Sequence, residues 1–165
     1  RFPMVHDIVR AMPNLPVGIG QGVTALYADV RTSTDVTSQV ETLIAPLGQA
    51  EWIADEAQFN AVTALSGCGP AFLFRFVDAL ARAAEAIGIP AEQAARMALG
   101  TVQGAASMAA SASDSPAALA DQVASPGGMT RKGLDMLDAD DRLLRLLTDT
   151  LTAARDRGEA MARGE

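Results

Sequence analysis

Two short segments combine glycine, proline and hydroxyl side chains in a way that could bring the backbone close to a ligand. They are SGCGP at residues 66–70 and SPGGMT at residues 125–130. Gly127 and Gly128 permit such an approach because they carry no side chain. Thr130 is expected at the start of a helix, where free N–H groups and the helix dipole favour a carboxylate or phosphate. Composition alone leaves a second interpretation open for both segments, that of simple turns.

The other candidate residues argue against a metal centre or a catalytic triad. The one histidine, His6, is expected at the start of a strand and leaves no metal cluster and no triad to assemble. The one cysteine, Cys68, excludes an internal disulfide and fits a reducing compartment. We interpret it as a small packing residue, with a reactive thiol as the alternative. The acidic run at 138–141 lacks the glycine and the terminal glutamate of a calcium loop, so it favours a helix start.

The segment GIGQG at residues 18–22 has the glycine content of a dinucleotide-binding loop but lacks its context. Such a loop follows a strand and opens a helix. Here a strand-like VTALY follows, and Val23 stands at the third glycine position of the motif. We interpret the segment as a turn.

Residues 1–55 have the pattern of a small α/β unit. Three short segments bounded by turn residues predict strands at 6–14, 22–30 and 50–55. Between the last two, residues 32–48 predict an amphipathic helix that begins with hydroxyl and acidic residues and ends at a glycine. These elements are too few to close a sheet, so we expect the end of an α/β domain.

Residues 56–165 predict helices throughout. Pro70 fits the first turn of a helix over 71–88, in which the polar residues form one narrow stripe and the rest of the surface is apolar. A helical segment of this length can scarcely bury such a helix by itself. We therefore expect a partner subunit to cover it.

Charge and hydropathy narrow the possible partners. The formal net charge is −7, and no run of Lys or Arg forms a basic patch, which argues against a nucleic-acid partner. We expect charged residues to interrupt each apolar stretch before the about 18–20 residues that cross a membrane. Without a membrane span or a leader, the expected location is the cytoplasm. The chain starts at Arg1 rather than Met, which suggests a fragment.

The chain resembles the pyrroline-5-carboxylate reductase family over essentially all of its 165 residues. The matching segments are VRAMPNLP, GVTALY, VTALSGCGPAF, DQVASPGGMT and the Ala-rich helices between them, in the family's order and spacing. The SG-x-GPA segment and the SPGG-x-T segment preceded by D-x-V are the specific signals. The family's N-terminal βαβ portion, which carries the Gly-rich dinucleotide cradle, is absent.

The resemblance implies a fold class, mainly α. A helical dimerisation and substrate-binding domain at 56–165 is preceded at 1–55 by a short α/β remnant of a Rossmann-like cofactor domain. It also implies the last step of proline biosynthesis, in which L-1-pyrroline-5-carboxylate is reduced to L-proline with NADPH or NADH and no metal. The family forms homodimers, some of which assemble further. We expect the isolated chain to be inactive, because it lacks the cradle for the dinucleotide.

The resemblance also implies roles for individual residues. Thr130 is the expected catalytic residue, with its hydroxyl near the imine nitrogen. The expected substrate-binding residues, which hold the carboxylate, are Ser125, Gly127, Gly128, Met129 and Thr130. The expected cofactor-binding residues are Met12, Pro13, Asn14, Ser66, Gly67 and Pro70.

Four positions depart from the residues common in the family, which has Thr, Ser, Tyr and Thr at Leu15, Cys68, Phe72 and Met129. The alternatives are a non-catalytic dimerisation fragment, a reductase-like regulatory protein, or a reductase for another imine or a hydroxyacid. The intact SPGG-x-T segment argues against loss of function.

Overall fold

The computed structural model describes residues 7–165, and His6, with its predicted place at the start of a strand, lies outside them. The chain divides into two compact units, the first formed by Arg1–Ala71 with Thr150–Glu165 and the second by Phe72–Asp149. The last part of the C-terminal helix thus belongs with the strands. The predicted domain boundary at 55/56 rests on the change from strand-like to helical sequence patterns, and it stays a prediction.

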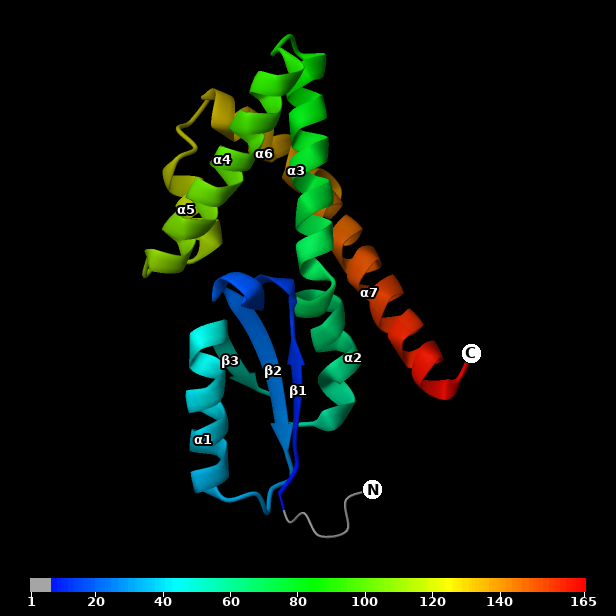
Figure 1. The fold of residues 1–165 in the computed structure, drawn as a ribbon. Coiled ribbons are helices and arrows are strands. Elements are labelled where there is room, and N and C mark those ends of the chain that lie inside the picture. The colour runs from blue at the N-terminus through cyan, green and yellow to red at the C-terminus, as the bar shows by residue number, and fades with distance from the viewer. Residues whose placement is uncertain (1–6) are drawn as a thin grey trace. The chain divides into compact units, whose positions relative to one another are not determined.

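Within the described part of the first unit, three strands form one sheet in the order β1-β2-β3 (Figure 1). Strand β1 (Val9–Pro13) runs antiparallel to β2 (Gly22–Ala28), which runs parallel to β3 (Gly48–Trp52). Parallel neighbours need a crossover connection, and helix α1 (Thr34–Ile44) supplies it. The predicted three strands and one helix are confirmed, with shorter strands than expected.

The sequence sets both ends of the crossover helix. The Ser33 hydroxyl accepts a hydrogen bond from the Val36 N–H at 3.4 Å and caps the N-terminus of α1. At the other end a short 3-10 helix leads to Gly48, whose φ of +127° is open to glycine and strained for other residues. A side chain there would also collide with the neighbouring strand, because a Cβ would lie 2.2 Å from the Gly22 carbonyl oxygen.

The core of the first unit surrounds β2. Thr24, Ala25 and Leu26 are buried, together with Ile44 of α1 and Phe59. The Phe59 ring packs edge-on against Tyr27 and lies 3.9 Å from the Arg10 guanidinium carbon. Strand β2 thus forms the centre of this core, and α1 and Phe59 pack against it.

A continuous helical stretch follows the sheet, and it corrects one expectation. Helix α2 (Phe59–Val62) continues through a π-helical turn (Thr63–Gly67) into α3 (Gly69–Ala86). SGCGP therefore lies inside a continuous helical stretch and is not a simple turn. Its first residues widen the helix, since the Cys68 N–H donates to the Thr63 carbonyl five residues back.

The second unit is helical. After α3 it contains α4 (Ala91–Ser111), α5 (Pro116–Gln122), α6 (Met129–Asp138) and the start of α7 (Arg142–Arg163). The acidic run leads into α7 through a 3-10 turn at Ala139–Asp141, which confirms it as a helix start.

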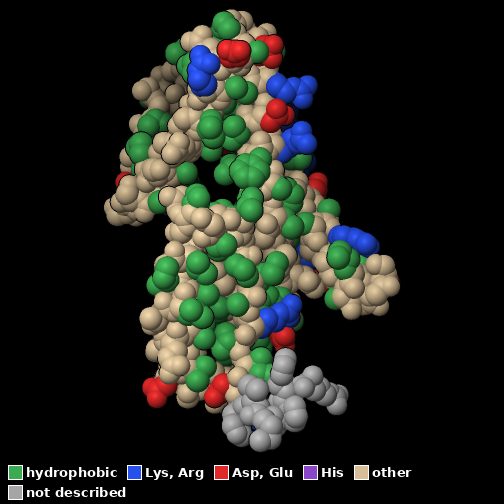
Figure 2. All heavy atoms as spheres, viewed as in Figure 1, with side chains coloured by type: hydrophobic (Ala, Val, Ile, Leu, Met, Phe, Trp, Pro, Cys, Tyr) green, Lys and Arg blue, Asp and Glu red, His purple; other side chains and the backbone are tan. Residues whose placement is uncertain are grey.

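The helices of the second unit leave much apolar surface uncovered by their own chain. Among its described residues, the buried hydrophobic side chains are three alanines, Ala94, Ala98 and Ala124. Helix α3, described in full, has no buried residue, and its Phe74 and Phe76 are 61% and 50% exposed. Apolar side chains reach the surface over both units in Figure 2. Exposed apolar side chains mark an interaction site where they form a contiguous patch.

We expected charged residues to interrupt each apolar stretch before it is long enough to cross a membrane, and this expectation is wrong for Glu56–Ala86. This helical stretch is long and apolar enough to cross a membrane by length and composition, because residues 57–74 contain no charged side chain. One such helix is weak grounds for a membrane span, since a helix that packs inside a protein meets the same criterion.

We predict that Gly48→Ala destabilises the first unit by roughly 2–4 kcal/mol, because it adds a clash at a left-handed glycine. Gly18→Ala is the matched control: a Cβ there has no neighbour within 4 Å and its φ is not positive. Its expected effect is within about 0.5 kcal/mol. Urea unfolding of the three proteins measures both values, and equal stability of the two variants would contradict the packing described for Gly48.

Candidate functional site

The residues predicted to do chemistry fall into two groups, one in each unit. The substrate-side residues lie in the turn between α5 and α6 and at the start of α6, in the second unit. Most of the cofactor-side residues lie around the end of β1, in the first unit.

The SPGGMT segment forms a tight turn that leads directly into α6. The Gly128 N–H donates to the Ser125 carbonyl at 2.9 Å, which leaves Pro126 and Gly127 at the centre of the turn. Gly127 has a φ of +71°, the left-handed conformation that glycine adopts without strain. Gly128 is also restricted, because a Cβ there would lie 3.0 Å from the Ser125 carbonyl oxygen. The backbone conformation therefore requires glycine at residue 127, and a side chain at residue 128 would force the Ser125 carbonyl to shift.

The start of α6 offers backbone donors. The helix begins at Met129, and Gly128 caps it without a side-chain hydrogen bond in the described structure. The first N–H groups of a helix have no acceptor one turn earlier, so those of Met129, Thr130 and Arg131 point out of the N-terminus. Met129 is 93% exposed and Thr130 is also exposed. This arrangement suits a small anion with a carboxylate or phosphate group.

The Gly128 N–H differs from the expected arrangement. The resemblance gives it to the substrate carboxylate, whereas in the structure it already donates to the Ser125 carbonyl. In this conformation Gly128 shapes the turn, and the N–H groups that follow it are the available donors.

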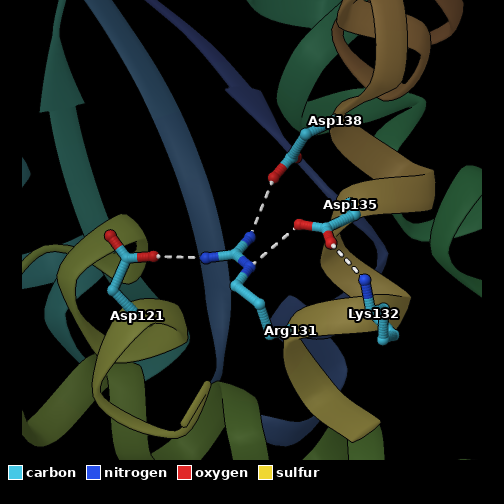
Figure 3. Close-up of polar contacts among 5 residues, drawn as sticks. All are labelled: Asp121, Arg131, Lys132, Asp135 and Asp138. Atoms are coloured by element: carbon cyan, nitrogen blue, oxygen red, sulfur yellow. Dashed lines mark hydrogen bonds and ion pairs between the residues drawn. The ribbon is translucent and has the colours of Figure 1, made fainter. Parts of the chain in front are cut away.

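Arg131, which the sequence analysis did not single out, links the two helices that flank the turn. Its guanidinium pairs with Asp121 of α5 and with Asp135 and Asp138 of α6 (Figure 3). The i,i+4 spacing of Arg131 and Asp135 is a signal that sequence could have given. The pair with Asp121, ten residues earlier, has no such periodic signature.

On the cofactor side, Asn14 joins three parts of the first unit. Its side-chain oxygen accepts the Val23 N–H at 2.9 Å, and its amide nitrogen donates to the Ser66 carbonyl at 3.0 Å. Asn14 thereby connects the end of β1 to the start of β2 and to the π-helical turn. The Ser66 hydroxyl is used locally, as a donor to the Val62 carbonyl at 2.9 Å.

Four of the predicted cofactor residues are brought together here. Besides Asn14 and Ser66, Met12 lies next to Gly67, where a Cβ would be 3.7 Å from the methionine methyl carbon. Pro13 is the exposed last residue of β1, and Pro70 lies in the first turn of α3. Their contact with a cofactor stays a prediction.

The GIGQG segment has no dinucleotide-binding geometry. It forms the end of a 3-10 helix (Leu15–Ile19) and a left-handed Gly20, and strand β2 follows it instead of a helix. The interpretation as a turn is confirmed.

Two charged pairs whose pKa values are shifted, Asp29 with Arg31 and Glu165 with Arg163, do not include any of the predicted site residues. Hydrogen bonds from Arg31 lower the pKa of Asp29, and a hydrogen bond from Arg163 lowers the pKa of Glu165. Within residues 7–165, His, Cys, Asp and Glu side chains form no group of three that could hold a metal ion.

Comparison with known proteins identifies the family. The pyrroline-5-carboxylate reductase dimerisation family matches residues 56–161. The chain is 39% identical over 157 residues to pyrroline-5-carboxylate reductase of Pseudomonas aeruginosa, covering 95% of this chain and 57% of that protein. It is 44% identical over 131 residues to the Aquifex aeolicus reductase, covering 79% and 49%. The chain thus spans about half the length of the curated relatives it matches.

Solved structures agree. A pyrroline-5-carboxylate reductase from Coxiella burnetii superimposes with a TM-score of 0.88 at 37% identity, over 93% of this chain and 57% of that one. The Plasmodium falciparum pyrroline carboxylate reductase with NADP bound gives a TM-score of 0.79 at 28% identity, over 94% and 58%. The resemblance noted in the sequence and the predicted fold class, mainly α with a short α/β remnant, are confirmed. The chain belongs to the pyrroline-5-carboxylate reductase family.

Proposed function

We propose that this chain is the dimerisation and substrate-binding part of an enzyme that reduces L-1-pyrroline-5-carboxylate to L-proline with NADPH or NADH. The observation that carries the proposal is the turn at residues 125–128, in which a left-handed Gly127 leads into a helix N-terminus that has no side-chain cap. This geometry suits a small carboxylate ligand.

In this proposal the substrate carboxylate lies at the N-terminus of α6. The N–H groups of Met129 and Thr130 and the Ser125 hydroxyl donate to it, and Gly127 and Gly128 keep the approach free of side chains. The Thr130 hydroxyl donates a hydrogen bond to the ring nitrogen of the neutral imine, or accepts a hydrogen bond from its N–H once the nitrogen is protonated. A protonated C=N group is more electrophilic, so its carbon accepts the hydride while the π electrons move to nitrogen. Binding and orientation then supply most of the catalysis.

The reduced nicotinamide supplies the hydride when it is bound. Met12, Pro13 and Asn14 at the end of β1 would lie against the nicotinamide half of the cofactor, with Ser66, Gly67 and Pro70 shaping the same part of the site. The Asn14 side chain makes two hydrogen bonds to the protein and retains one further amide hydrogen. It can therefore donate a hydrogen bond to the carboxamide group of the nicotinamide. The NADP found in the Plasmodium falciparum relative supports a nicotinamide cofactor here.

The active form in this proposal is a homodimer or a larger homo-oligomer. The exposed apolar side chains of α3 favour it, as does the dimerisation family that matches residues 56–161. We further propose a cytoplasmic enzyme that needs no metal, nucleic acid or membrane, with the cofactor domain ending near residue 55.

A non-catalytic dimerisation fragment or a regulatory protein is the second candidate. It is favoured by one observation, that residues 7–165 contain no strand followed by a glycine-rich turn and a helix. The intact turn at 125–128 favours the reductase. A reductase for another imine or a hydroxyacid would differ in one measurable property, since L-proline would not inhibit it.

Thr130→Ala in the complete reductase is expected to lower kcat/KM about 5- to 150-fold. This corresponds to a loss of roughly 1–3 kcal/mol of transition-state stabilisation, because the variant lacks a hydrogen bond to the ring nitrogen. Thr130→Ser is the matched control, since it keeps the hydroxyl. Steady-state kinetics with pyrroline-5-carboxylate measures both, and equal losses in the two variants would remove the hydroxyl from the mechanism.

The 165-residue chain by itself is expected to show no turnover with NADPH or NADH and pyrroline-5-carboxylate. The described residues hold no cradle for the cofactor pyrophosphate. The measurement is the decrease of reduced-nicotinamide absorbance over time, and turnover comparable to a complete reductase would show this expectation to be wrong.

Phe74→Asp is expected to shift the protein from dimer to monomer, because it places a charge on the exposed apolar side of α3. Val30→Asp is the control, since Val30 is fully exposed in a loop of the first unit. Sedimentation velocity distinguishes the two states. A monomeric parent, or a dimer that tolerates Asp at residue 74, would rule out this surface as the interface.

A further inference from the structure

Arg131 is the centre of a charged cluster that spans the turn between α5 and α6. Its Nη1 lies 3.2 Å from Asp121 Oδ1, its Nε 3.1 Å from Asp135 Oδ1, and its Nη2 3.5 Å from Asp138 Oδ2 (Figure 3). Lys132 adds a weaker pair within α6, with its Nζ 4.0 Å from Asp135 Oδ2. Each nitrogen of the guanidinium thus faces a different carboxylate.

The arrangement of these partners gives the cluster a direction. Asp135 and Asp138 lie on the same helix as Arg131 and fix the plane of its guanidinium from one side. The remaining nitrogen then faces Asp121, which lies in the last turn of α5, before the 125–128 turn. A planar guanidinium presents its donors to the three carboxylates in fixed directions, whereas a lysine ammonium presents three donors from one compact, rotating centre.

Burial supports a defined position for Arg131. Its side chain is 30% exposed, whereas that of Asp121 is 74% exposed and that of Asp138 is 67% exposed. The guanidinium is therefore the sheltered member of the cluster. Isolated surface pairs contribute little to stability, but a cation held by several carboxylates forms a network with defined geometry.

The cluster also sets the charge beside the helix N-terminus. Arg131 immediately follows Thr130, and its three aspartates would repel a carboxylate ligand if their charge were not offset. Arg131 offsets part of that charge while its side chain ties the two helices together.

We infer that Arg131 is a positioning residue that, through Asp121, holds residues 124–130 in the conformation that presents N–H groups to an anion. The inference relies on the proposed function for the identity of that anion, the substrate carboxylate. Arg131 itself donates its guanidinium to the protein and need not touch the substrate.

Amide hydrogen exchange of the 165-residue chain without ligand tests the positioning. We expect Arg131→Ala and Asp121→Asn each to raise exchange roughly two- to fivefold at the hydrogen-bonded amides of this segment, those of Ala124 and Gly128. The double variant should exceed neither single variant, because both remove the same contact. Lys132→Ala is the matched control and should leave exchange at 124–130 unchanged, since its pair lies within α6. The Asp121 side chain is exposed, so the Asp121→Asn variant is expected to fold normally. Unchanged exchange in this variant would overturn the inference.

Kinetics of the complete reductase tests the consequence. Arg131→Ala is expected to raise KM for pyrroline-5-carboxylate by about three- to tenfold and to change kcat by less than about twofold, because it disturbs binding of the carboxylate. Arg131→Lys keeps the charge but loses the fork, so it should restore KM in part. A full restoration of KM by Lys, with exchange still raised, would show that charge alone matters and would overturn the positioning role. Absence of turnover in the unmodified enzyme would instead refute the proposed function, and exchange would still decide the role of Arg131 in the turn.

Discussion

The apolar surface that the helical unit leaves uncovered is the constraint on which the rest of the structure depends. Helix α3 has apolar side chains around most of its circumference, yet all of its residues are described and none is buried. Burial of apolar surface is the main stabilising contribution to a folded helix pair, at about 25 cal/mol per Å². Three buried alanines among the described residues of this unit are a small core by that measure. Stability of these helices therefore has to come largely from association, which links assembly to any chemistry at the 125–128 turn.

A turn on such helices has to be held rigid by local contacts. The turn at 125–128 achieves this with the hydrogen bond from the Gly128 N–H to the Ser125 carbonyl and the left-handed Gly127. The Arg131 cluster adds a connection between the helices on either side. None of these contacts requires a large core, so the donors at the start of α6 can be arranged in advance of binding, which lowers the entropic cost of holding a ligand.

Much of the fold follows from local sequence patterns. A hydroxyl cap at Ser33 and the glycine at 48 mark the two ends of the helical crossover in both the sequence and the structure. The π-helical turn at Thr63–Gly67 was missed because a single widened turn leaves the apolar periodicity almost unchanged. The Asp121 partner of Arg131 was missed because a turn between two helices separates them, and periodicity describes contacts within one helix. The prediction that charged residues interrupt every apolar stretch was wrong for residues 57–74. The residues that interrupt this stretch are uncharged polar residues and glycines, which lower its hydropathy too little to exclude a membrane span.

Asn14, which is predicted to bind the cofactor, also has a structural role that the sequence alone does not reveal. A donor and an acceptor on one short side chain are needed to bond both the Val23 N–H and the Ser66 carbonyl. Aspartate would place a carboxylate oxygen against the Ser66 carbonyl, and leucine would leave both backbone groups without a partner, at a cost of about 1–3 kcal/mol for each buried group. The structural demand is therefore sufficient to fix asparagine at this position. A role toward the cofactor has to act through the one amide hydrogen that remains, or through the position of the π-helical turn that Asn14 holds.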